Sequence, residues 1–183
     1  MKSIITKIPS REAFLKGEDT LKIGYPWLTY GAVIALEEVI KPDFKILEFG
    51  SGGSTIFFAN NAESVFSFES NENWYEMVKK SLSTKKIKNV EIIYADRKTT
   101  SNTVKTFKDN YFDIILVDSD PQRSRRLQVA SMAVPKLKVG GWLVLDNYNK
   151  FGLNDFDYKN FEVYTFDEFG YTGTGTRLCK KIK

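Results

Sequence analysis

The stretch that decides the fold is Glu48-Phe49-Gly50-Ser51-Gly52-Gly53-Ser54-Thr55, a glycine-rich turn between two regular elements. It follows the apolar run 45–49, which predicts a strand, and it leads into residues 55–61, which predict a helix. Glycines let a backbone turn sharply and approach a ligand without a Cβ clash, and the helix presents free N–H groups at its start. This order indicates a site for a nucleotide-like ligand, although such a turn is weakly specific by itself.

The alternation of strands and helices continues along the chain. Further strands are predicted at 64–69, 90–94, 112–117 and 142–145. Further helices are predicted at 27–40, 72–83 and 123–137, the last of them stopped by Gly140-Gly141. The polar stretch 97–108 is expected to be irregular or weakly helical, and two antiparallel strands are expected at 161–166 and 174–180. The expected fold is therefore α/β, a three-layer sandwich with a seven-stranded, mostly parallel sheet that ends in an antiparallel C-terminal hairpin.

Length and composition fit one globular domain. The chain has 183 residues, of which 42% are hydrophobic and 27% charged, and its net charge is +4. No apolar run approaches the roughly 20 residues that span a bilayer, and residues 1–7 lack the features of a signal peptide. We therefore expect a cytoplasmic protein with no membrane partner. Residues 1–183 are expected to form a single domain, with 1–26 as an N-terminal extension that caps the substrate.

The residue types that are missing exclude several kinds of chemistry. The chain has no histidine, and its one cysteine is Cys179. Internal disulfides, thiolate-based zinc sites, histidine-ligated metals and hydrolases with a histidine base are therefore excluded. Any proton transfer must use Asp, Glu, Lys or Tyr, or need no protein base.

Polar side chains occur where the predicted strands end. These positions are Glu48, Glu69, Asp96, Asp118 and Asp146-Asn147. The carboxyl ends of parallel strands meet at one edge of a sheet, and ligands bind there at the switch point. We therefore expect these side chains to converge on one site.

Three details favour S-adenosylmethionine over a dinucleotide as the ligand. The glycines depart from the dinucleotide spacing G-x-G-x-x-G, because Thr55 stands at the third position. The acidic Glu48 precedes the loop, where it could serve the cationic amino-acid part of the ligand. The fifth strand closes with 140–146 and not with another mononucleotide-binding half.

Residues 45–59, 65–82 and 112–147 resemble the class I S-adenosylmethionine-dependent methyltransferases, which have a Rossmann-like fold. The resemblance implies a cofactor site at Glu48, Gly50, Ser51, Gly52, Ser54, Thr55, Glu69, Asp96 and Asp118. In this comparison Glu69 binds the ribose and Asp96 contacts the adenine. Two alternatives stay open from the residues alone: Glu48 braces the loop, and Asp96 is a simple turn residue. A Rossmann-like domain that binds another nucleotide, or none, is also open.

A second resemblance concerns Asp118, Asp146 and Asn147. They look like the metal triad of catechol-type and sugar-type O-methyltransferases, which implies catalytic roles for Asp118 and Asp146 and makes Mg²⁺ a candidate cofactor. The catechol-type enzymes carry a lysine shortly after the first aspartate, whereas this chain has Asp120-Pro121-Gln122 there. The alternative is that these residues position the cofactor without a metal.

The expected reaction is O-methylation of a small molecule or a saccharide. Nucleic acid is a less favoured partner, because Asp118-Ser119-Asp120-Pro121 does not satisfy the signature of enzymes that methylate base amines. The alternatives are an RNA or protein methyltransferase that uses Arg123, Arg125 and Arg126 as its basic contact, and a non-catalytic cofactor-binding module. The aromatic segment 166–171 is a candidate lid or homodimer contact.

Overall fold

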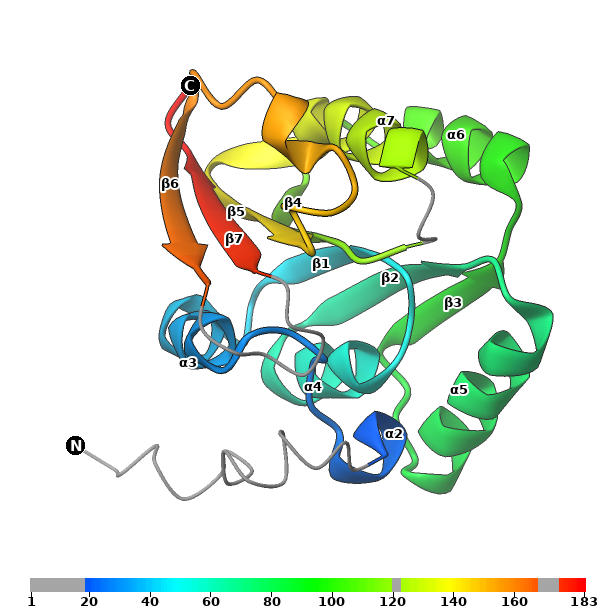
Figure 1. Cartoon of the computed structure of the whole chain (residues 1–183). Helices are drawn as coiled ribbons and strands as arrows, with labels where there is room; N and C mark the ends of the chain where they lie inside the picture. Colours follow the sequence, from blue (N-terminus) through cyan, green and yellow to red (C-terminus); the bar gives the residue numbers. More distant parts are fainter. Residues whose placement is uncertain (1–18, 120–122, 168–174) are drawn as a thin grey trace.

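One sheet with the strand order β3-β2-β1-β4-β5-β7-β6 forms the centre of the molecule (Figure 1). The computed structural model describes residues 19–119, 123–167 and 175–183. The strands are β1 (Lys45–Phe49), β2 (Ser64–Glu69), β3 (Val90–Tyr94), β4 (Phe112–Val117), β5 (Leu137–Asp146), β6 (Phe161–Phe166) and β7 (Thr176–Lys181). Strands β1 to β5 pair in parallel, and β7 runs antiparallel between β5 and β6. The predicted fold class is confirmed.

Helices cover both faces of this sheet. They are α2 (Thr20–Ile23), α3 (Tyr30–Val39), α4 (Gly53–Asn61), α5 (Glu72–Thr84), α6 (Arg97–Thr106) and α7 (Arg123–Ala133), with the 3-10 turns η2 (Val134–Lys136) and η3 (Leu153–Asp155). Figure 1 shows α6 and α7 on one face and α3 and α4 on the other. Within the described ranges, no helix is long and apolar enough to cross a membrane.

Alternating side chains of the central strands build a separate core on each face. Ile46 and Ile114 pack in the cluster that includes α3 and α4, while Leu47 and Ile115 pack in the cluster that includes α6 and α7. All four are fully buried, as expected for a parallel sheet covered on both sides. Each contributes on the order of 1.5–3 kcal/mol of burial free energy. The strand ends that follow are therefore held on a rigid frame.

The chain reverses its direction of winding at β1, which lies between β2 and β4. Strands β2 and β3 extend the sheet on one side, and β4 and β5 extend it on the other. Open α/β sheets bind ligands beyond the carboxyl ends of their strands at this switch point. The loops after β1, β2, β4 and β5 are thus the elements that position the site.

The prediction of a helix from 123 to 137 was wrong at its end. Helix α7 ends at Ala133, the turn η2 follows, and β5 already begins at Leu137. Pro135 lies in the first turn of η2, where its missing N–H cannot continue an α-helical ladder. Gly140 has a φ of 81° beside the register shift in the β4–β5 pairing. The two glycines therefore lie within β5 and do not stop a helix.

Most of the polar stretch 97–108, expected to be irregular or weakly helical, forms the regular helix α6, which ends at Thr106. The Asp96 carboxylate caps it by accepting the N–H of Thr99 at 2.8 Å. Thr100 and Val104 are buried, so one face of a polar helix packs on the protein. A side-chain cap and a narrow buried face are enough to order it.

Only the end of the predicted N-terminal extension lies within the described residues. There α2 packs on α4 and α5, because Leu21 joins a small cluster with Ile56 and Val78. Residues 1–18 lie outside the described part, and the substrate cap stays a prediction. Segment 120–122 and most of the candidate lid 166–171 also lie outside it.

Candidate cofactor and active site

A cleft of about 470 Å³ opens at the predicted edge of the sheet. Of the residues that the sequence assigned to the cofactor, Gly50, Ser51, Glu69 and Asp118 line it. Its remaining walls come from β2, the start of α5, and the facing sides of α6 and α7. The convergence of strand ends thus produces a cavity of the size that small-molecule ligands occupy.

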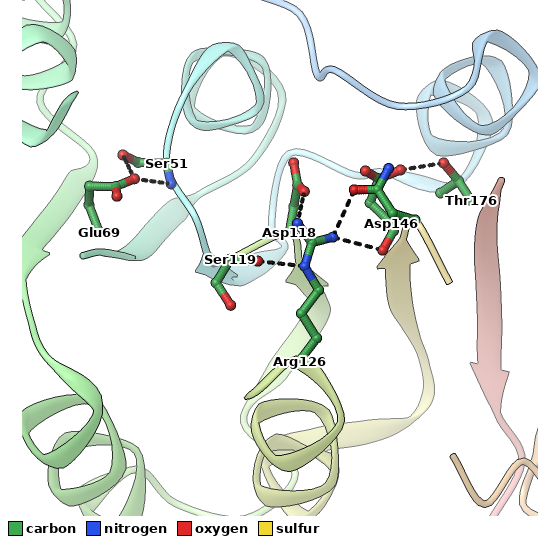
Figure 2. Close-up of polar contacts among 8 residues, drawn as sticks. Ser51, Glu69, Asp118, Ser119, Arg126, Asp146 and Thr176 are labelled. Atoms are coloured by element: carbon green, nitrogen blue, oxygen red, sulfur yellow. Dashed lines mark hydrogen bonds and ion pairs between the residues drawn. The ribbon is translucent and has the colours of Figure 1, made fainter. Parts of the chain in front are cut away.

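The Glu69 carboxylate lies at this cleft and is held by neutral donors. Oε2 accepts the N–H of Ser51 at 3.1 Å and the Ser51 hydroxyl at 3.0 Å. Oε1 accepts the N–H groups of Ser70 and Asn71, both at 2.8 Å. Figure 2 shows Ser51 and Glu69 facing each other across the ends of β1 and β2. This hydrogen-bonded loop positions an acceptor group at the cleft through neutral donors.

Two contacts fix the glycine-rich loop itself. The indole N–H of Trp74 donates to the carbonyl of Ser51 at 2.7 Å, and Trp74 lines the cleft. Gly50 has a φ of 93°, and a Cβ there would lie 2.4 Å from the carbonyl oxygen of Asp118. Only glycine fits this backbone conformation and this close approach between the β1 and β4 loops.

Glu48 lies behind the loop and is fully buried. Its Oε2 accepts the hydroxyls of Thr55 and Ser67, each at 2.6 Å, and the Thr55 oxygen accepts the N–H of Gly52 at 2.9 Å. Burial raises the pKa of Glu48 to about 7, although hydroxyl donors, with Ser54 first, lower it. This geometry corresponds to the loop-bracing alternative: Glu48 and Thr55 support the turn from beneath and do not line the cleft.

The side chain of Arg126 lies between the ends of β4 and β5 (Figure 2). Nη2 pairs with Oδ1 of Asp118 at 3.1 Å, and Nη1 donates to the Asp146 carbonyl at 2.9 Å and to Oδ1 of Asn147 at 3.1 Å. Nε donates to the carbonyl of Ser119. Arg126 is 4% exposed, whereas the Asp118 side chain is 27% exposed and lines the cleft, so a buried guanidinium pairs with a carboxylate at the cleft wall.

The two aspartates at these strand ends have perturbed acidities. Desolvation raises the pKa of Asp118 to about 6 against the opposing charge of Arg126. Burial raises the pKa of Asp146 well above its usual range, and the charge of Asp118 adds to this. The Thr176 hydroxyl donates to Oδ1 of Asp146 at 2.8 Å. Burial thus raises the pKa of both aspartates, and the charge of Arg126 opposes this shift at each of them.

Asp118, Asp146 and Asn147 converge as predicted, but they do not fit a divalent metal. The Asp118 carboxylate and the Asn147 amide oxygen are both turned to the Arg126 guanidinium. A second cation there would meet a charge that cannot be removed, since guanidinium stays protonated. Across the described ranges, no three Asp, Glu or Cys side chains form a group that could hold a metal ion.

Several predicted cofactor residues lie off the cleft wall. They are Glu48, Gly52, Ser54, Thr55 and Asp96. Asp96 is exposed and caps α6, and the backbone hydrogen bond from Thr99 lowers its pKa. Its neighbours Ala95 and Arg97 line the cleft instead. An adenine contact by Asp96 stays a prediction.

Sequence reasoning missed Trp74 and considered Arg126 only as part of a basic contact for RNA or protein. Trp74 lies one turn after Asn71, the residue that caps α5. An aromatic residue so close in sequence to Glu69 could have been predicted to line the cofactor cleft. Arg126 stands in a run of arginines, which normally indicates a solvated face. Only its place at the start of the helix after β4 hinted that it turns toward the strand ends.

The comparisons with known proteins identify the family of this chain. A family model described as a methyltransferase domain matches residues 47–148, more than half of the chain. The chain therefore belongs to this methyltransferase family, and with its Rossmann-like sheet it is a class I S-adenosylmethionine-dependent methyltransferase. A search of curated proteins finds no match.

Solved structures share the fold at low sequence identity. An O-methyltransferase from Bacillus cereus in complex with S-adenosylhomocysteine is 18% identical, with a TM-score of 0.69 over 82% of this chain and 78% of that one. An rRNA methylase from Streptococcus thermophilus is 18% identical, with a TM-score of 0.66 over 83% and 96%. A tRNA (m1A58) methyltransferase from Aquifex aeolicus is 16% identical, with a TM-score of 0.66 over 96% and 77%. These likenesses show the fold and leave the acceptor open.

Proposed function

We propose that the cleft binds S-adenosylmethionine with its ribose hydroxyls on Glu69. A carboxylate has about four lone-pair sites, and the neutral donors from Ser51, Ser70 and Asn71 already use them. The Ser51 hydroxyl is the donor that can rotate away, whereas the backbone N–H groups are fixed. The ribose therefore takes the place of this hydroxyl. The adenine then lies toward Ala95 and Arg97, within reach of Asp96 if that carboxylate leaves the α6 cap.

We propose further that the protein methylates a hydroxyl of a small molecule or a saccharide. The observation that carries this proposal is the Asp118 carboxylate, which lines the cleft and has a pKa of about 6. A general base works best when its pKa lies near the working pH, and this chain has no histidine to serve instead. When bound, S-adenosylmethionine would supply a sulfonium methyl group: the acceptor oxygen forms a bond to the methyl carbon while the bond from sulfur to that carbon breaks, and S-adenosylhomocysteine leaves. Asp118 takes the hydroxyl proton, and Asp146 with its Thr176 hydrogen bond positions Asp118.

An RNA acceptor has less support from this geometry. The basic contact suggested by the sequence included Arg126, but Arg126 is 4% exposed and paired with Asp118. A buried guanidinium cannot neutralise a phosphate backbone. Because Arg126 is not available to an RNA backbone, a small acceptor that enters the cleft fits this structure better than RNA does.

Transfer of a labelled methyl group to a panel of alcohols, saccharides, RNA and protein tests the proposal. Asp118→Asn is expected to lower the rate on the best hydroxyl acceptor by roughly 100-fold or more, because it removes the base. Asp157→Asn, on an exposed loop, is the matched control and should keep the rate. The wild-type rate should rise with pH through about 6, as Asp118 loses its proton.

Full activity of Asp118→Asn would contradict the base assignment. Transfer to RNA alone would contradict the acceptor class. Binding of S-adenosylhomocysteine without transfer to any acceptor would favour a non-catalytic module.

A further inference from the structure

The oxygens around Arg126 are the kinds of ligand that bind a hard metal cation. They comprise one carboxylate oxygen of Asp118, one amide oxygen of Asn147 and the main-chain carbonyls of Ser119 and Asp146. Carboxylate, amide and carbonyl oxygens are the ligands that Ca²⁺ and Mg²⁺ prefer. Here all of them face a guanidinium at the end of β4 and β5 (Figure 2).

The surrounding structure holds the guanidinium in this position. Arg126 is almost fully buried, and its Cζ lies 4.4 Å from the centroid of the Phe151 ring, so an aromatic face covers it. Asn147 has a φ of 50°, a conformation that asparagine adopts more readily than most residues. The Asp146 carbonyl and the Asn147 side chain therefore both meet the guanidinium from a single turn. Four protein oxygens, two of them from the backbone, hold Arg126 in place.

We propose that Arg126 stands where a divalent cation would otherwise bind, so that methyl transfer is independent of metal and its acceptor needs only a single hydroxyl. A bound metal holds an acceptor by coordinating two neighbouring oxygens. A guanidinium offers no coordination positions, and four of its five N–H groups here are directed at protein oxygens. Neighbouring hydroxyls on the acceptor therefore bring no advantage. The acceptor part of this inference rests on the proposed function, whereas the substitution of a cation by Arg126 does not.

The first test measures Mn²⁺ binding by electron paramagnetic resonance on the full chain. Wild type is expected to leave added Mn²⁺ free. Arg126→Gln removes the positive charge and leaves the oxygens, so it should bind one Mn²⁺ at least about tenfold more tightly than wild type does. The double variant Arg126→Gln with Asp118→Asn should lose this gain. Two control variants should not gain Mn²⁺ binding. Arg126→Lys keeps a positive charge at the site, and Arg97→Gln removes a positive charge elsewhere at the cleft.

Either of two results would overturn the inference. One is Mn²⁺ binding by wild type that Asp118→Asn abolishes. The other is a folded Arg126→Gln protein, checked by circular dichroism, that gains no Mn²⁺ site. If Arg126→Gln does not fold, the wild-type titration and its Asp118→Asn counterpart still decide the question.

The second test measures activity. Methyl transfer by wild type should be unchanged in excess chelator, and an acceptor with one hydroxyl should react as well as its matched vicinal diol. Loss of transfer in chelator, restored by Mg²⁺, would overturn the inference while leaving the proposed function intact. Failure to methylate any hydroxyl would instead contradict the proposed function, and the Mn²⁺ titration would still stand.

Discussion

The ends of β1 and β2 and the ends of β4 and β5 hold carboxylates in opposite ways. At β1 and β2, the hydrogen bonds described for Glu48 and Glu69 come from hydroxyl and backbone N–H donors, and Oε1 of Glu48 is buried without a partner among the described residues. At β4 and β5, Asp118 is paired with the guanidinium of Arg126. Both regions lie on the same edge of one sheet, so the fold does not dictate the difference.

This difference separates binding from chemistry. Neutral donors can be exchanged for ligand hydroxyls without leaving a buried charge, which suits a carboxylate that must receive a ribose. The guanidinium of Arg126 cannot leave without exposing the unpaired carboxylate of Asp118. This arrangement suits a carboxylate that must stay in one position while the acceptor is methylated. We infer that the β1–β2 region binds and that the β4–β5 region is a permanent part of the catalytic frame.

The largest expected effect comes from breaking the β4–β5 region with Arg126→Met. Removal of one partner of a buried ion pair typically costs about 3–5 kcal/mol, and Arg126 also joins two strand ends through backbone carbonyls. The free energy of unfolding, measured by denaturant titration, should fall by about 3 kcal/mol or more. The exposed Arg97 provides the control, because Arg97→Met should change the free energy of unfolding by less than about 0.5 kcal/mol. Equal effects of the two changes would contradict the frame role of Arg126.

The next effect concerns the pH dependence of the β1–β2 region. The pKa of Glu48 is raised to about 7 in the folded protein, so folding binds its proton more tightly. The stability that the protonated group contributes is fully present below the unfolded pKa and is lost as pH rises through about 7. Glu48→Gln has no proton to lose at this position, so its side chain contributes the same stability at every pH. The difference in unfolding free energy between wild type and Glu48→Gln should therefore shift by about 3 kcal/mol between pH 4 and pH 8, and a difference independent of pH would contradict the burial of the charge.

A smaller effect tests the exchange of donors at Glu69. Glu69→Gln replaces acceptor oxygens facing N–H groups with a carboxamide, and a hydrogen bond to a charged group contributes roughly 1.5–3 kcal/mol. S-adenosylhomocysteine should bind about 10- to 100-fold more weakly by calorimetry. Glu72→Gln, exposed at the start of α5, should leave the affinity unchanged. Unchanged affinity of Glu69→Gln would contradict the ribose assignment.

The smallest effect concerns the loop contact of Trp74. Trp74→Phe keeps the aromatic wall of the cleft but removes the hydrogen bond to the Ser51 carbonyl. A neutral hydrogen bond contributes about 1 kcal/mol, so affinity for S-adenosylhomocysteine should fall about fivefold. Trp142→Phe, on β5 and away from the cleft, is the matched control. An equal loss in both variants would show that Trp74 does not position the loop.

The sequence predicts the frame well and the polar site less well. The strand at 112–117 was predicted correctly because a short, nearly continuous apolar run is typical of a strand buried on both faces of a parallel sheet. The prediction for α6 stayed between irregular and weakly helical structure because the stability of this helix comes from the Asp96 cap and a narrow buried face, which a polar composition hides. The junction of α7 and β5 was misplaced because Gly140 supports a local irregularity inside a strand, a role that a glycine pair does not reveal.

Arg126 shows why the site could not be completed from the sequence. Asp118, Asp146 and Asn147 were correctly expected to converge, because strand ends in a parallel sheet must meet. What fills the space between them depends on the rotation of α7 about its own axis. Its arginine run shows no clear apolar face to fix that rotation, so a metal and an arginine were equally compatible with the pattern.

A crystal structure with S-adenosylhomocysteine, grown with millimolar Mn²⁺, tests the central claim most directly. We predict the ribose hydroxyls on Glu69, with the Ser51 hydroxyl turned away, and the guanidinium of Arg126 still between Asp118 and Asn147 with no anomalous Mn²⁺ signal. A Mn²⁺ ion bound by Asp118 and Asn147 with Arg126 displaced, or a nucleoside bound away from Glu69, would contradict it.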